Sequence, residues 1–357
     1  MIDPTRLRRL ALATGILIIA VLASPALARA QSPELAMREF ASGQIKKGVR
    51  SIGFGGDGAT WGNYGLVYRE AGTALADVGI SGYTNGNQFT FTAVGATTPP
   101  LWHGLAIYVI ALSQHAENIR LLLSSPALGQ SRSMIGSGAN QAFFTKIAAP
   151  LGHGVSAGVL LSYELSQFDA ATTFADPDPT SVHYATRWRP SGGFGLAWQP
   201  NPRILVGTRA ILNHDQEVRT DELSTTQGLA RSYEFRLGLS VSPWTGGILD
   251  AGATELYKRN GLTGVTSHAL HPNLGIEQAL ASNALVVRAG VDETSYGGGI
   301  TVRRRPLQLD IAYVYDLGRA RVGSLFGTTS SSILATLTFD LSWRPTTPAP
   351  PPAGHAG

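Results

Sequence analysis

Two glycine-rich patterns in the sequence hold residue types that carry chemistry in other proteins. Residues 53–58 (GFGGDG) match G-x-G-x-x-G, which cradles dinucleotide phosphates only between a strand and a helix, and no helical pattern follows them. Residues 154–158 (GVSAG) match G-x-S-x-G, whose serine acts as a nucleophile on a sharp strand-to-helix turn. Here Ser156 lies in a stretch that alternates apolar and polar residues, so we interpret it as a small hydroxyl on the inner face of a strand.

The histidines form no recognisable catalytic or metal-binding set. His268 and His271 lie three residues apart, which places them on opposite faces of a strand and makes them a poor metal pair. No spacing ties a histidine to a serine and an acid. We therefore predict a protein that is not an enzyme, with no catalytic residue, no cofactor and no metal.

Charged residues recur on the more polar face of the C-terminal segments. These predicted inner charges are Arg288, Asp292, Arg303, Arg305, Asp310 and Asp316. Opposite charges on neighbouring strands pair favourably. We favour a bracing role for them over a role in selecting solutes.

A second group of residues could bind an apolar ligand. The segment 102–112 is apolar on both faces, and 113–139 is expected to be a long loop that adds further leucines. The predicted ligand-pocket residues are Leu105, Ile107, Tyr108, Ile110, Leu121, Leu122 and Leu123. An apolar passage or pocket inside the protein would suit hydrophobic molecules.

The elements that position these residues are predicted to be strands. In residues 285–343 apolar side chains occupy every second position, as in a sheet with one apolar and one polar face. Alternation and turn signals predict fourteen strands, with twelve to sixteen allowed, at 61–69, 88–97, 102–112, 140–149, 153–165, 191–198, 203–213, 231–242, 247–258, 266–278, 284–293, 297–304, 307–316 and 331–343.

The connections between these segments alternate between short turns and longer polar loops, which include 113–139, 166–190 and 214–230. Short turns at one end and long loops at the other are typical of a transmembrane antiparallel β-barrel, with the short turns in the periplasm. An even number of strands puts both ends of the barrel segment on that side.

Residues 1–30 are predicted to be a cleaved signal peptide. A basic start precedes the apolar run 10–22 and a small-x-small site at 28–30, so cleavage is expected before Gln31. The whole chain has 28 Lys and Arg against 24 Asp and Glu; residues 1–30 contain four Arg and one Asp, which leaves 24 against 23. This balance gives no reason to expect nucleic-acid binding.

Four regions follow from these patterns. After the signal peptide, residues 31–60 are expected to form a short helix and a glycine-rich plug segment, 61–343 the all-β outer-membrane barrel, and 344–357 a disordered Pro-rich tail. The sequence has no cysteine, so no disulfide holds it.

Both ends of the barrel region resemble the FadL/PorV-like superfamily of outer-membrane barrels. Residues 53–59 (GFGGDGA) and 68–72 (YREAG) correspond to the family's glycine-rich opening and its Tyr-Asn-Pro-Ala-Gly-like motif, with Arg69 and Glu70 in place of Asn-Pro. Residues 288–290, 296–300 and 310–313 are similar to the closing strands of the PorV-like branch. The resemblance implies a barrel with an N-terminal hatch in its lumen.

The resemblance also implies two functions. The first is passive uptake of hydrophobic small molecules through a plugged lumen in the bacterial outer membrane, with membrane lipid and a hydrophobic ligand as partners. The alternative is a non-transport role as an outer-membrane partner in protein secretion or surface assembly, which would bind another protein.

Overall fold

Strands make up nearly all of the chain that the computed structural model describes. The described residues are 66–67, 69, 72–83, 88–125, 130–172, 181–186, 189–221, 225–259, 264, 266–292, 295–316 and 330–341. The strands are β1 Thr73–Tyr83, β2 Gln88–Thr97, β3 Ala106–Ser125, β4 Gln130–Gly152, β5 Val155–Thr172, β6 Ser181–Thr186, β7 Arg189–Asn201, β8 Ile204–Asp221, β9 Thr225–Val241, β10 Gly247–Arg259, β11 Thr266–Leu280, β12 Leu285–Asp292, β13 Ser295–Arg304, β14 Leu307–Asp316 and β15 Ser330–Asp340. Two 3-10 turns, Trp102–Gly104 and Ala281–Asn283, lie between strands.

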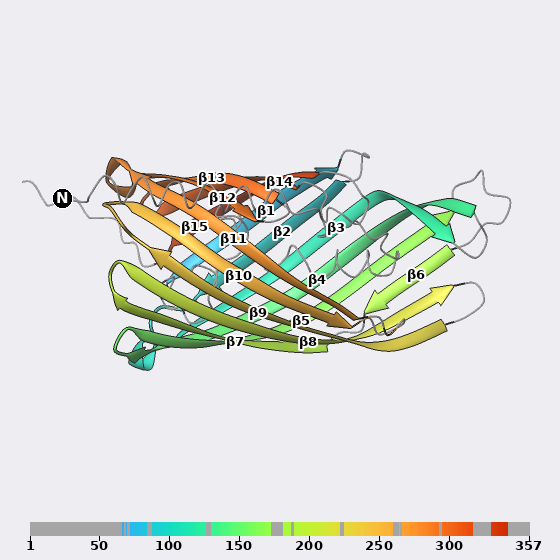
Figure 1. The fold of residues 1–357 in the computed structure, drawn as a ribbon, viewed down its shortest axis with the longest axis horizontal. Coiled ribbons are helices and arrows are strands. Elements are labelled where there is room, and N and C mark those ends of the chain that lie inside the picture. The colour runs from blue at the N-terminus through green and yellow to red at the C-terminus, as the bar shows by residue number, and fades with distance from the viewer. Residues whose placement is uncertain are drawn as a thin grey trace, which may run out of the picture.

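These strands close into one antiparallel barrel (Figure 1). Each strand pairs with its neighbours in sequence, and the ring closes where β1 pairs with β15, with Thr73 opposite Asp340. The short β6 and the strand β7 both pair with β5 and with β8, so together they occupy one position in the wall. The barrel therefore has fourteen strand positions, as the alternation predicts.

The two faces of each strand differ as a membrane barrel requires. On β9, Tyr233, Phe235, Leu237 and Leu239 point outward and are exposed, and between them Arg236 and Ser240 point inward and are buried, as Gly238 is. A band of exposed aliphatic and aromatic side chains is unstable in water and stable in contact with lipid acyl chains. The chain is therefore a transmembrane β-barrel.

Within the described residues, no helix has the length and apolar character needed to cross a bilayer.

The two ends of the barrel differ in their connections. At the end that holds the start of β1 and the end of β15, short turns such as Gly152–Gly154 and Arg305-Pro306 join the strands. This is the periplasmic end by the usual arrangement of outer-membrane barrels. At the outer end, β3, β4 and β5 have 20, 23 and 18 residues, whereas β12 has 8 (Figure 1).

The prediction of long polar loops at the outer end was wrong for much of their length. The expected loop 113–139 is mostly strand, because β3 continues to Ser125 and β4 begins at Gln130. Likewise β8 and β9 take up most of 214–230. Outside the membrane both faces of a strand meet water, so apolar alternation stops although the hydrogen-bonded ladder continues.

The first strand was also misplaced. Alternation predicts it at 61–69, but Leu66 and Val67 have 3-10 helical geometry, and the strand is β1 at Thr73–Tyr83. Its inward positions carry Leu75, Asp77 and Gly79, a set too mixed to read as one face. The predicted regions 1–30, 31–60 and 344–357, and the motif at 53–58, lie outside the described residues.

Candidate functional site on the inner wall

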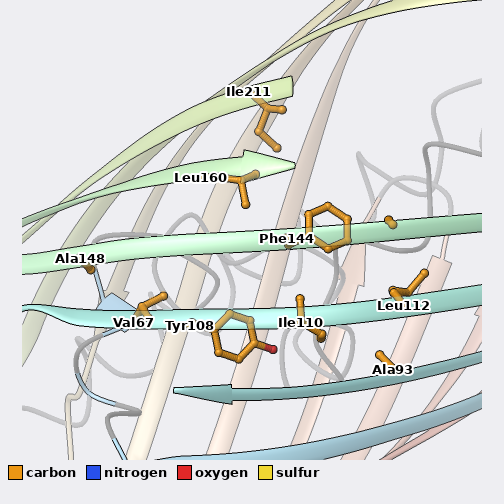
Figure 2. Close-up of a cluster of buried hydrophobic side chains, with 10 residues drawn as sticks. Val67, Ala93, Tyr108, Ile110, Leu112, Phe144, Ala148, Leu160 and Ile211 are labelled. Carbon is orange, nitrogen blue, oxygen red and sulfur yellow. The ribbon is translucent and has the colours of Figure 1, made fainter. Parts of the chain in front are cut away.

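One side of the inner wall carries a cluster of buried apolar side chains, which we call the apolar patch. It consists of Val67, Ala93, Tyr108, Ile110, Leu112, Ala142, Phe144, Ala148, Leu160 and Ile211 (Figure 2). Nine of them come from the inward positions of β2, β3, β4, β5 and β8. The tenth, Val67, precedes β1.

The apolar patch is built by the inward positions of consecutive strands. Tyr108, Ile110 and Leu112 occupy successive inward positions of β3, and Lys146 of β4 pairs in register with Tyr108. The Lys146 ammonium lies 4.8 Å from the centre of the Tyr108 ring, which is a cation–π contact. Lys146 therefore places a cationic group at the edge of the patch.

Residues just before β1 also lie against the inner wall. Leu66 packs with Ala197 of β7 and Leu205 of β8, and Val67 belongs to the apolar patch; both are less than a tenth exposed. Figure 2 shows Val67 beside Ala148 and Tyr108. The segment that leads into β1 thus lies against the stretch of wall from β3 to β8, near the periplasmic turns.

The wall from β8 to β14, which we call the polar sector, is lined by buried charges. Its centre is Arg288 of β12, whose Nε lies 3.4 Å from Oε2 of Glu277 on β11 and whose Nη1 lies 3.3 Å from Oδ1 of Asp310 on β14. Thr301 of β13 donates a hydrogen bond to Asp310 and accepts one from Arg288. The Arg288 side chain is fully buried and has a carboxylate partner on each side.

A second charged group in the polar sector lies on β8 and β9. Arg209 and Arg236 are opposite each other in register, and both are buried. The Glu234 carboxylate lies 3.6 Å from Nη2 of Arg209 and 2.5 Å from Nε of Arg236. One carboxylate therefore offsets the repulsion between two buried guanidinium groups. Nearby, Ser240 of β9 donates a hydrogen bond to Asp250 of β10.

The structure separates the predicted ligand-pocket residues into three groups. Tyr108 and Ile110 lie in the apolar patch. Ile107 shares the outward face of β3 with Val109, and Leu105 precedes the strand in the turn region. Leu121, Leu122 and Leu123 lie on the outer part of β3, opposite Met134, Ser133 and Arg132 of β4, and their side chains are outside the described set.

The predicted inner charges are likewise separated. Arg303 donates a hydrogen bond of 2.8 Å from Nε to Gln308, whose Nε2 donates one of 2.6 Å to Asp310, so Arg303 joins the Arg288 group. Asp292 accepts hydrogen bonds from the backbone N–H and the hydroxyl of Ser295 at the outer end of β12.

The remaining two predicted charges lie at or just beyond the ends of strands. Arg305 is exposed in the turn between β13 and β14, so it lies off the inner wall. Asp316 ends β14 opposite Ser295 and Ser330, and its side chain is outside the described set.

Ser156 and the pair His268 and His271 all lie on strands. Ser156 is buried on β5 opposite Pro150 of β4, and no helix follows it, so it has no nucleophile elbow. His271 is buried, while His268 on the other face bonds to Glu255 through a 2.8 Å contact. Among the described residues no group of three or more His, Cys, Asp or Glu is arranged to hold a metal.

Sequence reasoning missed the charges on β8 to β11. Glu234, Arg236 and Ser240 share the inward face of β9 with Gly238, and aromatic and leucine side chains alternate with them on the outward face. That alternation was visible in the sequence, and the charge on its inner face was the signal that could have found them.

Comparisons with known proteins agree on the fold. No family model and no curated protein matches the sequence. Among solved structures, the Pseudomonas putida toluene transporter TodX superposes with a TM-score of 0.53 at 9% identity, covering 83% of this chain and 98% of that one. The monoaromatic hydrocarbon channel CymD gives 0.53 at 13% identity, with 82% and 96% covered. A Pseudomonas aeruginosa FadL homologue gives 0.50 at 12% identity, with 79% and 94% covered.

The fold is that of the FadL-type outer-membrane β-barrels. Because these identities are low, the similarity shows the architecture of the barrel and does not indicate a ligand. It extends over 94% to 98% of the length of these three proteins. The three proteins are described as channels, transporters or their homologue, and not as enzymes. The similarity to the PorV-like branch stays a prediction.

Proposed function

We propose that this FadL-type barrel is a passive outer-membrane channel for hydrophobic small molecules. The observation that carries the proposal is the apolar patch inside the barrel. A water-filled pore is lined by polar groups, whereas this wall presents Tyr108, Ile110, Leu112 and Phe144 on its inner face. Binding of an apolar solute to such a surface is favourable by a free energy on the order of 25 cal/mol for each Å² of apolar surface removed from water.

The position of the apolar patch supports a path that ends at the periplasm. Tyr108 and Ala148 lie within a few residues of the periplasmic turns, where Val67 and Leu66 also contact the wall. We propose that the chain before β1, including residues 31–60, forms a plug in the lumen, and that the solute passes this plug as it leaves the barrel for the periplasm. Charges of the polar sector brace the opposite wall.

Uptake of radiolabelled toluene by intact cells that express the chain tests this function. The double variant Ile110→Asn with Phe144→Asn makes the apolar patch polar. It should lower the initial uptake rate about fivefold or more, where a factor of ten would correspond to a loss of about 1.4 kcal/mol in binding free energy. The matched control is Val286→Asn, which alters an equally buried inward position on β12 in the polar sector. Its uptake should stay within about twofold of the unaltered chain.

Two outcomes would refute the proposal. One is uptake that does not depend on expression of the chain. The other is an equal fall in uptake for the double variant and for Val286→Asn. Resistance of the folded barrel to SDS without heating confirms in each case that the ring is intact.

One observation favours the alternative, a partner in secretion or surface assembly. Strands β3, β4, β5, β8 and β9 have 17 to 23 residues, about twice the length that crosses a bilayer, so they offer a firm surface outside the membrane. Pull-down from solubilised membranes, with and without residues 344–357, tests it. Recovery of a specific partner together with unchanged toluene permeability would favour this role.

A further inference from the structure

A buried glutamine lies on the inner wall where the apolar patch ends. Along β3 the patch runs from Tyr108 to Leu112 (Figure 2), and Gln114 occupies the next inward position toward the outer end, where it is 3% exposed. Opposite it in register are Phe91 of β2, which packs against the patch, and Asn140 of β4. The amide of Gln114 therefore borders the surface on which we place the solute.

The side-chain oxygen of Gln114 has no hydrogen-bond partner in the part of the chain that the structure describes. A buried polar group without a partner costs free energy, and in native proteins such a group commonly binds a water or a ligand. Asn140, directly opposite, has an interaction of its own and leaves this oxygen unmet. Gln114 can therefore bond to a molecule in the lumen.

The charges near Gln114 favour a neutral partner. The row of inward residues just below it runs in register across five strands: Asp77 of β1, Ala93 of β2, Leu112 of β3, Ala142 of β4 and Glu164 of β5. An anionic solute would meet a carboxylate at each end of this row and no cation within it. A neutral hydroxyl avoids that repulsion, and because it both donates and accepts, it can bond to either end of the amide.

We propose that Gln114 is a hydrogen-bonding subsite for the hydroxyl group of a neutral phenol, whose ring lies on the apolar patch. This inference rests on the proposed function, because the patch must hold the apolar part of the solute. It adds a class of solute, apolar molecules with one hydroxyl group, and the residue that distinguishes them from hydrocarbons.

Binding of radiolabelled p-cresol and p-xylene tests the proposal, since the two differ only by a hydroxyl in place of a methyl group. The full chain is reconstituted in lipid nanodiscs, and equilibrium dialysis, with empty nanodiscs subtracted, gives each dissociation constant. Gln114→Met removes the amide and keeps the length of the side chain. The dissociation constant for p-cresol should then rise about five- to tenfold, the contribution of one hydrogen bond, while that for p-xylene should not rise.

The matched control is Asn273→Leu, which removes a similarly buried amide from the inward face of β11 in the polar sector. It should leave both dissociation constants within about twofold of the unaltered chain. The inference is overturned by a change under twofold for p-cresol in Gln114→Met, by an equal rise for p-xylene, or by an equal rise in the control.

One comparison needs no variant, so it decides the matter even where Gln114→Met does not refold. Hexadecane offers no hydrogen bond to a hydroxyl. Relative to partition from water into hexadecane, the unaltered barrel should therefore favour p-cresol over p-xylene by at least about tenfold. A barrel that discriminates between the two no better than hexadecane does has no such subsite.

Failure of the proposed function would look different. In that case the double variant Ile110→Asn with Phe144→Asn would bind p-xylene as well as the unaltered chain does. Loss of p-xylene binding in the double variant, together with p-cresol binding that does not depend on Gln114, would retain the channel and remove only the subsite.

Discussion

The guanidinium group of Arg288 on β12 and the carboxylate of Asp310 on β14 are bonded across the strand that separates them. Their Nη1 and Oδ1 atoms are 3.3 Å apart, and Thr301 of β13, between the two, bonds to both. Glu277 on β11 contacts the same guanidinium from the other side. One side chain thus ties together four consecutive strands that are joined by short turns.

Replacing this arginine should weaken the barrel strongly. Arg288→Met leaves Glu277 and Asp310 buried without their cation, and we expect the free energy of unfolding to fall by about 3–5 kcal/mol. Urea unfolding in lipid vesicles, followed by tryptophan fluorescence, measures it. The exposed Arg304→Met should change it by less than about 0.5 kcal/mol. In a triple variant that adds Glu277→Gln and Asp310→Asn, much of the loss should return; no return would show that charge burial is not the cause.

Alanine substitutions at two glycines around the turn between β4 and β5 allow a steric clash to be distinguished from backbone strain. Both have positive φ, 93° at Gly152 and 74° at Gly154, but a Cβ at Gly152 meets nothing within 4 Å, and one at Gly154 lies 2.2 Å from the Gln199 carbonyl oxygen. Gly154→Ala should therefore destabilise the barrel by about 2 kcal/mol more than Gly152→Ala. Equal losses in the same urea assay would mean that Gln199 moves freely.

The cation beside the apolar patch should influence which solutes pass. Lys146 lies over the Tyr108 ring on the inner wall. Lys146→Met removes the charge and keeps the length of the side chain, so uptake of an aromatic carboxylate such as benzoate should fall about three- to tenfold, while uptake of toluene should not fall. Parallel uptake measurements in cells check this. A similar fall for both solutes would point to a change in the shape of the patch.

The predicted processing site can be tested directly. N-terminal sequencing of the protein from outer membranes should start at Gln31, since the segment 28–30 fits a signal peptidase site. Replacing Ala28 and Ala30 by larger residues should leave the longer precursor. A first residue inside 1–30 in the unaltered protein would refute the predicted boundary.

The sequence was informative where one face of a strand meets lipid. There, outward residues such as Val287, Ile300 and Leu309 must be apolar, and period-two alternation located β12, β13 and β14 within a few residues. It was uninformative in the outer part of β8, where residues 214–221 (HDQEVRTD) show no apolar alternation although they continue the ladder with β9. It also missed β1, so the predicted number of strands agrees although its first member is displaced.

The inner wall was predictable only in part. Tyr108 and Ile110 were expected because their strand is apolar on both faces. Phe144, Leu160 and Ile211 join them only once the register of β4, β5, β7 and β8 sets which of their residues lie at the same level of the inner wall. Arg288 and Asp310 were predicted to lie on inner faces, but their bond depends on the register of β13 between them.

The ring closes through the contact of β1 with β15, in which Thr73 meets Asp340. The ribosome synthesises β1 early and β15 nearly last. The barrel therefore cannot close until the chain is complete through its final strand. Until then two strand edges stay open and can pair with other chains. A frameshift or nonsense codon before residue 330 therefore yields a substrate for proteolysis rather than a shorter barrel.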